Sequence, residues 1–176
     1  MKEAVLAGGC FWCTEAVFIN LKGVNNVVSG YIGGDITNPT YEMVCSGKSG
    51  HLEAIKIDFD PSIISYTTLL EVFFITHDPT QINGQGNDIG TQYLSAVFFY
   101  DEQQKKEAND YMEKLSQNYE LPIVTKLYSM NKFYPAEDYH QNYYNLNKTQ
   151  PYCEIVINPK MSKFRENYKH LLKTNS

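Results

Sequence analysis

Two adjacent glycines, Gly8-Gly9, lie between an apolar run and a helical pattern near the start of the chain. The residues before them, Ala4 to Ala7, are predicted to form a short buried strand, and the apolar residues between Ala16 and Leu21 have the spacing of a helix. Glycines interrupt both kinds of element and allow a sharp change of direction. The run Cys10-Phe11-Trp12-Cys13 is therefore predicted to lie where a strand enters a helix.

Strand and helix patterns alternate along the rest of the chain. Ile55, Ile57 and Phe59 alternate with polar residues, which is the two-residue period of a strand with one inward face. Apolar side chains in 108–115 fall at the i, i+3, i+4 and i+7 spacing of an amphipathic helix. Further strands are predicted at 24–31, 94–100 and 123–127, and further helices at 69–74, within 134–147, and after Ser162 as an N-cap.

This alternation argues for an α+β or α/β sandwich. We expect a mixed β-sheet with flanking helices, a ferredoxin-like core and long irregular loops, because the glycine-rich stretches argue against a regular Rossmann or barrel layout. The chain has 176 residues, 43% of them apolar, which is enough for one domain with its own core. Residues 1–176 are therefore expected to form a single domain.

The charge distribution limits the kinds of partner. The net charge is -5 and no basic block compensates for it, so we expect no binding to nucleic acid or to an anionic membrane. The first apolar stretch is far too short for a signal sequence or a membrane span. We therefore expect a cytoplasmic protein without a membrane segment.

Four cysteines, Cys10, Cys13, Cys45 and Cys153, are too sparse for the disulfide framework of a small secreted domain. In a reducing compartment they are catalytic, metal-bound or inert. Cys10 is predicted to lie at a helix N-terminus, which favours the reactive thiolate through free amide groups and the helix dipole. Burial as a structural cysteine is the alternative for each of them.

Cys10 and Cys13 also form a C-x-x-C pair, which can close a disulfide as in thiol oxidoreductases. A zinc site would need two further ligands, and no second closely spaced pair of cysteines or histidines is present. We expect neither a metal nor a cofactor. A general thiol-disulfide oxidoreductase and a metal-binding module remain the alternatives to a catalytic Cys10.

Glu53 lies an even number of residues before Ile55, Ile57 and Phe59, so its side chain is predicted to share their apolar strand face. A carboxylate on that face must be paired, protonated, or placed where proton transfer is needed, unless it reaches solvent at the strand end. We therefore predict a raised pKa for Glu53. Nearby His51 is expected to give hydrogen-bonding support, and Asp88, in a polar glycine-punctuated loop, reads locally as a turn or cap residue.

Several blocks of the sequence resemble the A-type peptide methionine sulfoxide reductases. Their hallmark Gly-Cys-Phe-Trp is present as Gly9-Cys10-Phe11-Trp12. Further blocks follow in the order found in that family, and the resemblance extends from Val5 to about Cys153. These blocks are Asn38-Pro39-Thr40-Tyr41, Gly50-His51-Leu52-Glu53, His77-Asp78-Pro79-Thr80, residues 85–93, and Ala136-Glu137-Asp138-Tyr139-His140-Gln141.

The resemblance implies roles for the residues around the first block. Cys10 corresponds to the nucleophile that attacks the sulfoxide sulfur. Phe11 and Trp12 correspond to residues that cradle the methyl group of the substrate.

The resemblance also implies how the sulfoxide oxygen is bound. Tyr41, Glu53 and Tyr93 correspond to residues that bind and protonate this oxygen, and Asp88 to an acidic residue that supports them. The oxygen must leave as water or hydroxide, so an acid and phenol hydroxyls lower the barrier. Glu53 is the expected acid.

The sequence does not decide which cysteine is the resolving thiol, the one that forms a disulfide with oxidised Cys10. The reaction leaves Cys10 as a sulfenic acid, which can condense with a second thiol. Many relatives have glycine at the position of Cys13 and use one or two cysteines near the C-terminus, whereas this chain has both Cys13 and Cys153. Cys45 occurs in many relatives without a redox role and is expected to be structural.

The implied function is reduction of free and protein-bound methionine-S-sulfoxide to methionine, as repair after oxidative damage. The preference for the S epimer follows from the resemblance alone. Thioredoxin or a similar dithiol donor is the expected partner. We expect the protein to act as a monomer.

Overall fold

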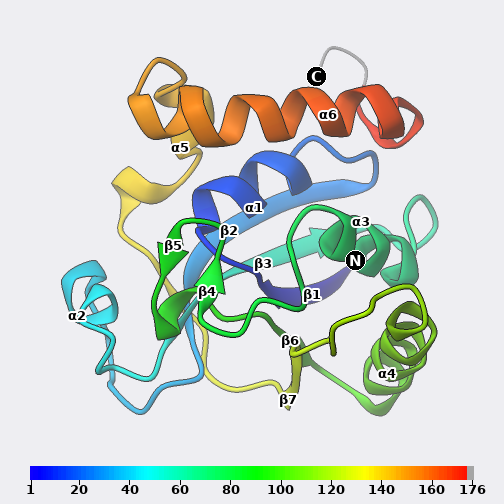
Figure 1. Cartoon of the computed structure of the whole chain (residues 1–176), viewed down its shortest axis with the longest axis horizontal. Coiled ribbons are helices and arrows are strands. Elements are labelled where there is room, and N and C mark those ends of the chain that lie inside the picture. Colours follow the sequence, from blue (N-terminus) through cyan, green and yellow to red (C-terminus); the bar gives the residue numbers. More distant parts are fainter. Residues whose placement is uncertain (174–176) are drawn as a thin grey trace.

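The computed structural model describes residues 1–173. Its strands and helices alternate along the chain (Figure 1). The strands are β1 (Lys2–Ala7), β2 (Val24–Ile32), β3 (Leu52–Phe59), β4 (Gly84–Gln85), β5 (Asp88–Ile89), β6 (Ala96–Phe99), β7 (Lys126–Ser129) and β8 (Tyr134–Pro135). The α-helices are α1 (Phe11–Phe18), α2 (Tyr41–Cys45), α3 (Tyr66–Ile75), α4 (Glu102–Ser116), α5 (Tyr143–Leu146) and α6 (Asn158–Tyr168).

Shorter helical turns complete this part of the chain. A π-helical turn, Cys153–Ile157, leads directly into α6. The 3₁₀ turns are Thr91–Tyr93, Asp138–His140 and Lys169–Leu171.

Within the described residues, six strands form one sheet in the order β7-β6-β1-β3-β2-β8. The element series β1-α1-β2-β3-α3-β6 places its four strands in the order β6-β1-β3-β2, with antiparallel neighbours. This is the ferredoxin-like core expected from the sequence. Because β7 pairs with β6 in parallel, the sheet is mixed, and the α+β prediction is confirmed.

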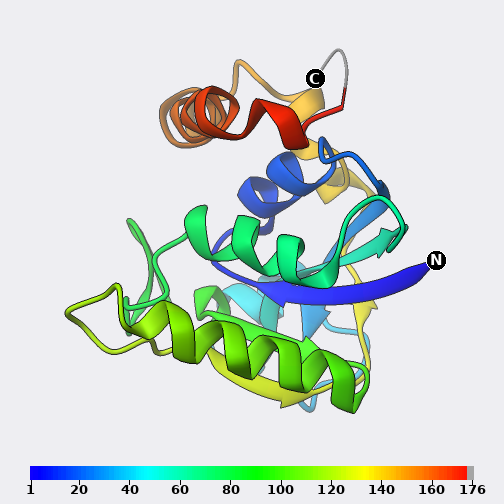
Figure 2. The same cartoon turned by 90° about the vertical axis from the view of Figure 1, so that its right-hand side faces the viewer.

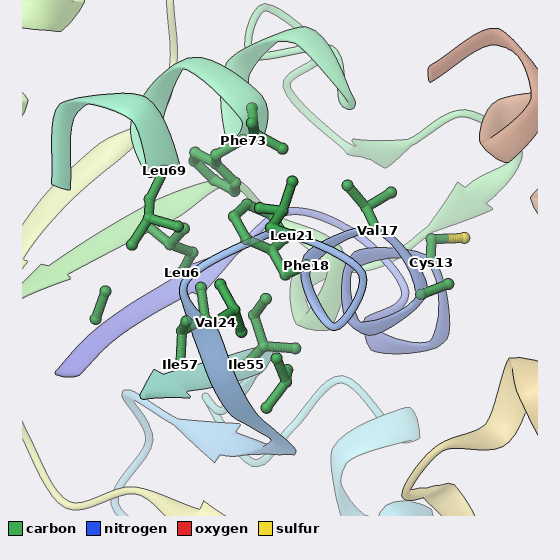
Figure 3. Packing of buried hydrophobic residues seen from close by; sticks show 14 of the residues in the cluster. Leu6, Cys13, Val17, Phe18, Leu21, Val24, Ile55, Ile57, Leu69 and Phe73 are labelled. Carbon is green, nitrogen blue, oxygen red and sulfur yellow. The ribbon is translucent and has the colours of Figure 1, made fainter. Parts of the chain in front are cut away.

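The main core lies between the sheet and helices α1, α3 and α4. Figure 3 shows side chains of α1 and α3 packed on those of β1 and β3, with Cys13 at the margin and its sulfur pointing outward. Val5, Ala7, Ile32, Ala54, Ala96 and Phe98 form a smaller cluster on the opposite sheet face. Alternate residues of β1 belong to the two clusters, as the strand period requires.

A second layer covers α1 on the side away from the sheet. Figures 1 and 2 both show α6 lying over α1, so α1 is enclosed between the sheet and α6. Every residue of α1 except Trp12 is accordingly buried. None of the helices described, up to residue 173, has the length and apolar character needed to cross a membrane.

Three predicted elements differ from the structure. The strand predicted at 123–127 is β7 at Lys126–Ser129, because the chain after Pro122 first runs as loop. The segment 134–147 contains only β8, a 3₁₀ turn and the short α5, because Asn142 adopts a left-handed conformation with φ 55° that interrupts a helix. Ser162 lies inside α6 and does not cap it, since the helical backbone is continuous from the π turn.

Candidate active site

Cys10 is the N-cap residue of α1, directly after the end of β1 and the two glycines. Gly9 has φ +91°, and a Cβ at this position would lie 2.8 Å from side-chain atoms of Gln85. Only glycine fits here without strain. The prediction that the cysteine pair lies where a strand enters a helix is confirmed.

The N-terminus of α1 favours the Cys10 thiolate as expected, but it does not decide the net shift of the Cys10 pKa in the free protein. The Trp12 amide does lower the pKa of Cys10, but burial, a hydrogen bond to Cys13 and the charge of Glu53 outweigh it and raise this pKa well above its ordinary value. The same hydrogen bond lowers the pKa of Cys13 to about 7, although burial opposes the shift. Without substrate, Cys10 is therefore a thiol, and Cys13 carries the larger share of thiolate.

Glu53 points into the protein from β3 and is 1% exposed. Its Oε1 accepts the backbone N–H of Phe11, next to Cys10, at 3.1 Å. Burial raises the pKa of Glu53 to about 8, against the opposing effect of the Phe11 amide, and the charge of Asp88 adds to the rise. The predicted raised pKa is thus confirmed in direction, and Glu53 can donate a proton at neutral pH.

Tyr41 and Tyr93 reach the same region from two separate elements. Tyr41 begins α2, and its backbone N–H donates to Glu137 Oε2 at 3.0 Å. Tyr93 ends the 3₁₀ turn after β5. Burial and the nearby charge of Glu53 raise the pKa of both phenols, so both stay protonated hydrogen-bond donors.

Trp12 is held between aromatic residues of the 138–143 segment. Its indole stacks on Tyr143, with ring centroids 3.8 Å apart and planes at 6°. Its Nε1–H donates to His140 Nδ1 at 3.0 Å. Phe11 is fully buried between Tyr31 and His140, with ring centroids at 5.7 and 5.1 Å. These rings form an apolar wall beside Cys10.

Asp88 lies in the β4–β5 hairpin and accepts a hydrogen bond from Tyr152, while its charge also raises the pKa of Tyr93. Tyr152 Oη donates to Asp88 Oδ2 at 2.6 Å and lies 3.6 Å from Cys13 Sγ. The local expectation of a turn or cap role is therefore incomplete, because Asp88 also connects the hairpin to the residue before Cys153. Through Tyr152, this carboxylate is linked to the Cys13 thiol.

The two remaining cysteines differ in environment. Cys153 is fully buried in the π turn, and burial raises its pKa. Cys45 is exposed at the end of α2; partial loss of hydration raises its pKa, although a hydrogen bond with Tyr41 opposes this shift. All four cysteines are free thiols.

His51 has the supporting role that its sequence position indicated. Its Nδ1 accepts the Gly34 N–H at 3.1 Å, and its Nε2 lies 2.8 Å from the Ile36 carbonyl oxygen. His51 thus holds the loop before α2. Among residues 1–173, no three side chains of His, Cys, Asp or Glu are arranged to hold a metal ion.

Several contacting residues were not singled out by the sequence reasoning, namely Glu15, Tyr31, Glu137, His140, Tyr143 and Tyr152. Glu137 accepts from both the Tyr31 hydroxyl and the Tyr41 amide. Glu137 and His140 lie within the matching block 136–141, which was the available signal. No local pattern marks Tyr143 or Tyr152, because both act through contacts with the distant α1.

Comparison with known proteins gives consistent matches over most of the chain. The family model described as peptide methionine sulfoxide reductase matches residues 2–172. Peptide methionine sulfoxide reductase MsrA from Chromobacterium violaceum is 54% identical over 174 residues, covering 98% of this chain and 99% of that protein. The protein of the same name from Sulfolobus acidocaldarius is 50% identical over 168 residues, covering 96% of each chain.

Solved structures agree with these sequence matches. Mxr1 from Saccharomyces cerevisiae in its reduced form has a TM-score of 0.78 and 31% identity, covering 84% of this chain and 86% of that one. Methionine sulfoxide reductase A of Corynebacterium diphtheriae has a TM-score of 0.74 and 32% identity, covering 83% and 74%. This chain, with its Cys10 block at the start of α1, belongs to the peptide methionine sulfoxide reductase family.

Proposed function

We propose that this protein reduces the S epimer of methionine sulfoxide, free and in proteins, to methionine. The observation that carries the proposal is Glu53, a buried acid with a pKa of about 8 whose oxygen is bonded to the amide next to Cys10. A proton donor and a thiol side by side suit removal of an oxygen from sulfur. The family match supports the same reaction.

In the first step, Cys10 Sγ forms a bond to the sulfoxide sulfur and loses its proton. Glu53 gives its proton to the sulfoxide oxygen, the S–O bond breaks, and the oxygen leaves as water with both protons. Tyr41 and Tyr93 donate hydrogen bonds to this oxygen as charge develops on it. The methyl group lies against Phe11 and Trp12.

In the second step, the water attacks Cys10 Sγ and the sulfur–sulfur bond breaks. Methionine is released, Cys10 becomes a sulfenic acid, and the remaining proton returns to Glu53. The net change is one thiol and one sulfoxide converted into one sulfenic acid and one thioether, so atoms and electrons balance.

Cys13 then attacks the sulfenic acid, closing a Cys10–Cys13 disulfide and releasing water. Three properties favour Cys13 over Cys153. It is hydrogen-bonded to Cys10, its pKa of about 7 provides thiolate at neutral pH, and the Tyr152 hydroxyl lies 3.6 Å from its sulfur. Cys153 is fully buried, and its raised pKa disfavours the thiolate.

We expect one turnover without reductant to produce the Cys10–Cys13 disulfide. Both cysteines lie in one tryptic peptide, residues 3–22, whereas Cys153 lies in residues 149–160. Mass mapping should therefore find peptide 3–22 lighter by two hydrogens. Cys153→Ser should keep this product and Cys13→Ser should lose it. A cross-link between the two peptides would assign resolution to Cys153.

The disulfide must be reduced before the next turnover, and a dithiol donor such as thioredoxin does this by exchange. The yeast relative Mxr1 has been solved in complex with Trx2. Such recycling and four free thiols support a reducing compartment, and we propose that the protein acts in the cytoplasm. We propose that it acts as a monomer.

The direct test is turnover of each methionine sulfoxide epimer with dithiothreitol as reductant. We expect reduction of the S epimer only, for the free amino acid and for a peptide. Turnover of the R epimer alone would overturn the substrate assignment. Reduction of protein disulfides without any sulfoxide turnover would instead identify a general thiol oxidoreductase built on the C-x-x-C pair.

A further inference from the structure

Glu15 is a buried carboxylic acid that no step of the proposed reaction uses. It lies in α1, three residues after Trp12, and is 2% exposed. Burial raises its pKa, although hydrogen bonds oppose the shift. An acid in such surroundings is costly unless donors satisfy its oxygens. The identity of its donors therefore indicates what Glu15 does.

Two of these donors belong to one turn of the chain. The backbone N–H of Tyr143 donates to Glu15 Oε1 at 3.3 Å, and the N–H of Asn142 also donates to the carboxyl group. Asn142 has a left-handed φ of 55°. The third donor is the Ser29 hydroxyl, at 3.2 Å from Oε2. Glu15 thus ties the 142–143 turn to the helix that carries Trp12.

The segment 140–143, which contains this turn, restrains the Trp12 indole through two contacts. The Tyr143 ring stacks on its face at 3.8 Å, and His140 Nδ1 accepts its N–H at 3.0 Å. A hydrogen bond fixes the in-plane position of the indole, and the stack fixes its tilt. A shift of the 140–143 segment would release both restraints together.

We propose that Glu15 is a positioning residue that holds Trp12 in place through the 140–143 segment and thereby sets the size of the pocket for the sulfoxide methyl group. This inference rests on the proposed function, in which Trp12 contacts that group. With the carboxyl group removed, the two amides lose their buried acceptor, the segment shifts, and the pocket admits larger S-alkyl groups.

The first arm of the test needs no substrate, because Trp12 is the single tryptophan of the chain. Glu15→Leu keeps much of the side-chain volume but has no acceptor. Its tryptophan emission should shift to longer wavelength and become more accessible to quenching by acrylamide. Glu15→Gln should restore wild-type fluorescence, since its amide oxygen can accept from the 142–143 turn and its NH₂ can donate to Ser29.

The second arm measures selectivity between methionine sulfoxide and its S-ethyl analogue, ethionine sulfoxide. One additional methylene in a fitted apolar pocket changes kcat/KM by about 10- to 200-fold. Glu15→Leu should lower the preference for the methyl compound by about tenfold, and Glu15→Gln should keep it. Ser29→Ala is the matched control, because it removes a hydrogen bond to the same carboxyl group without touching the 142–143 turn. It should leave both readouts unchanged.

A purely structural role predicts a different pattern. Glu15→Leu would then lose stability while its tryptophan quenching and methyl preference match those of Ser29→Ala, which would overturn the proposal. If Glu15→Leu does not fold, Glu15→Ala is measured in the same way. Its smaller side chain leaves room for water to bond the backbone N–H groups of residues 142 and 143. Failure of both to fold would also overturn the positioning role. Absence of sulfoxide turnover in the wild type would reject the proposed function, while the fluorescence arm would still decide the role of Glu15.

Discussion

Replacement of Glu53 by glutamine is expected to slow sulfoxide reduction by about 10²- to 10⁴-fold, the usual contribution of a general acid. The amide oxygen can still accept the Phe11 N–H that Glu53 accepts at 3.1 Å, so the start of α1 stays in place. What is lost is the transferable proton. Single-turnover methionine formation, with dithiothreitol absent, measures this step alone.

The same replacement should also remove a loss of folding stability that the wild type shows as pH rises. The pKa of Glu53 is about 8 in the native protein, against an ordinary value of 4.5. Between these values the unfolded chain has released the proton that the native protein still holds, so wild-type stability falls with pH across this window. Glu53→Gln lacks this loss and should be more stable near pH 7 by on the order of 3 kcal/mol.

Urea unfolding at pH 5, 7 and 8 compares the two proteins. Stability differences that stay constant with pH would show that Glu53 titrates normally, and unchanged single-turnover rates would remove it as the acid.

Above pH 8 the wild type itself should lose single-turnover rate, as Glu53 gives up its proton. Glu53→Gln should lack that dependence.

Cys10→Ser should abolish reduction, with a loss of at least about four orders of magnitude. A serine hydroxyl is a far weaker nucleophile toward sulfur, and it cannot form a sulfenic acid. Cys45→Ser is the control, because Cys45 is exposed and serine keeps the capacity to bond Tyr41. Methionine formation is measured with dithiothreitol. Any sustained turnover by Cys10→Ser would remove Cys10 from the mechanism.

A second measurement, the pH dependence of Cys13 alkylation, tests the hydrogen bond between Cys10 and Cys13 separately from the role of Cys10 as nucleophile. The hydrogen bond from Cys10 is the largest contribution that lowers the pKa of Cys13. In a Cys45→Ser background, Cys10→Ala should therefore shift the alkylation of Cys13 to higher pH, whereas Cys10→Ser can still donate to that sulfur. Equal alkylation profiles in the two variants would contradict the assigned hydrogen bond.

Local sequence patterns predicted the structure correctly where neighbouring residues determine it. The two-residue period of Ile55, Ile57 and Phe59 predicted β3 and the inward direction of Glu53, because neighbouring strand residues point to opposite faces. Gly8-Gly9 predicted the break before α1, since Gly9 needs a positive φ. The segment 134–147 was predicted less well, because its shape depends on Asn142 and on contacts with α1 rather than on its own periodicity.

The sequence by itself determined the position of Cys10 at the start of a helix, the inward direction of Glu53 and the family, because these depend on residue types at fixed spacing. Only the tertiary structure decided which neighbours tune them. The pKa values of Cys10 and Cys13 move in opposite directions because burial, Glu53 and a shared hydrogen bond act across α1 and β3. Trp12 is positioned by residues more than 120 positions away. Such effects depend on distances that folding creates, and no local pattern encodes them.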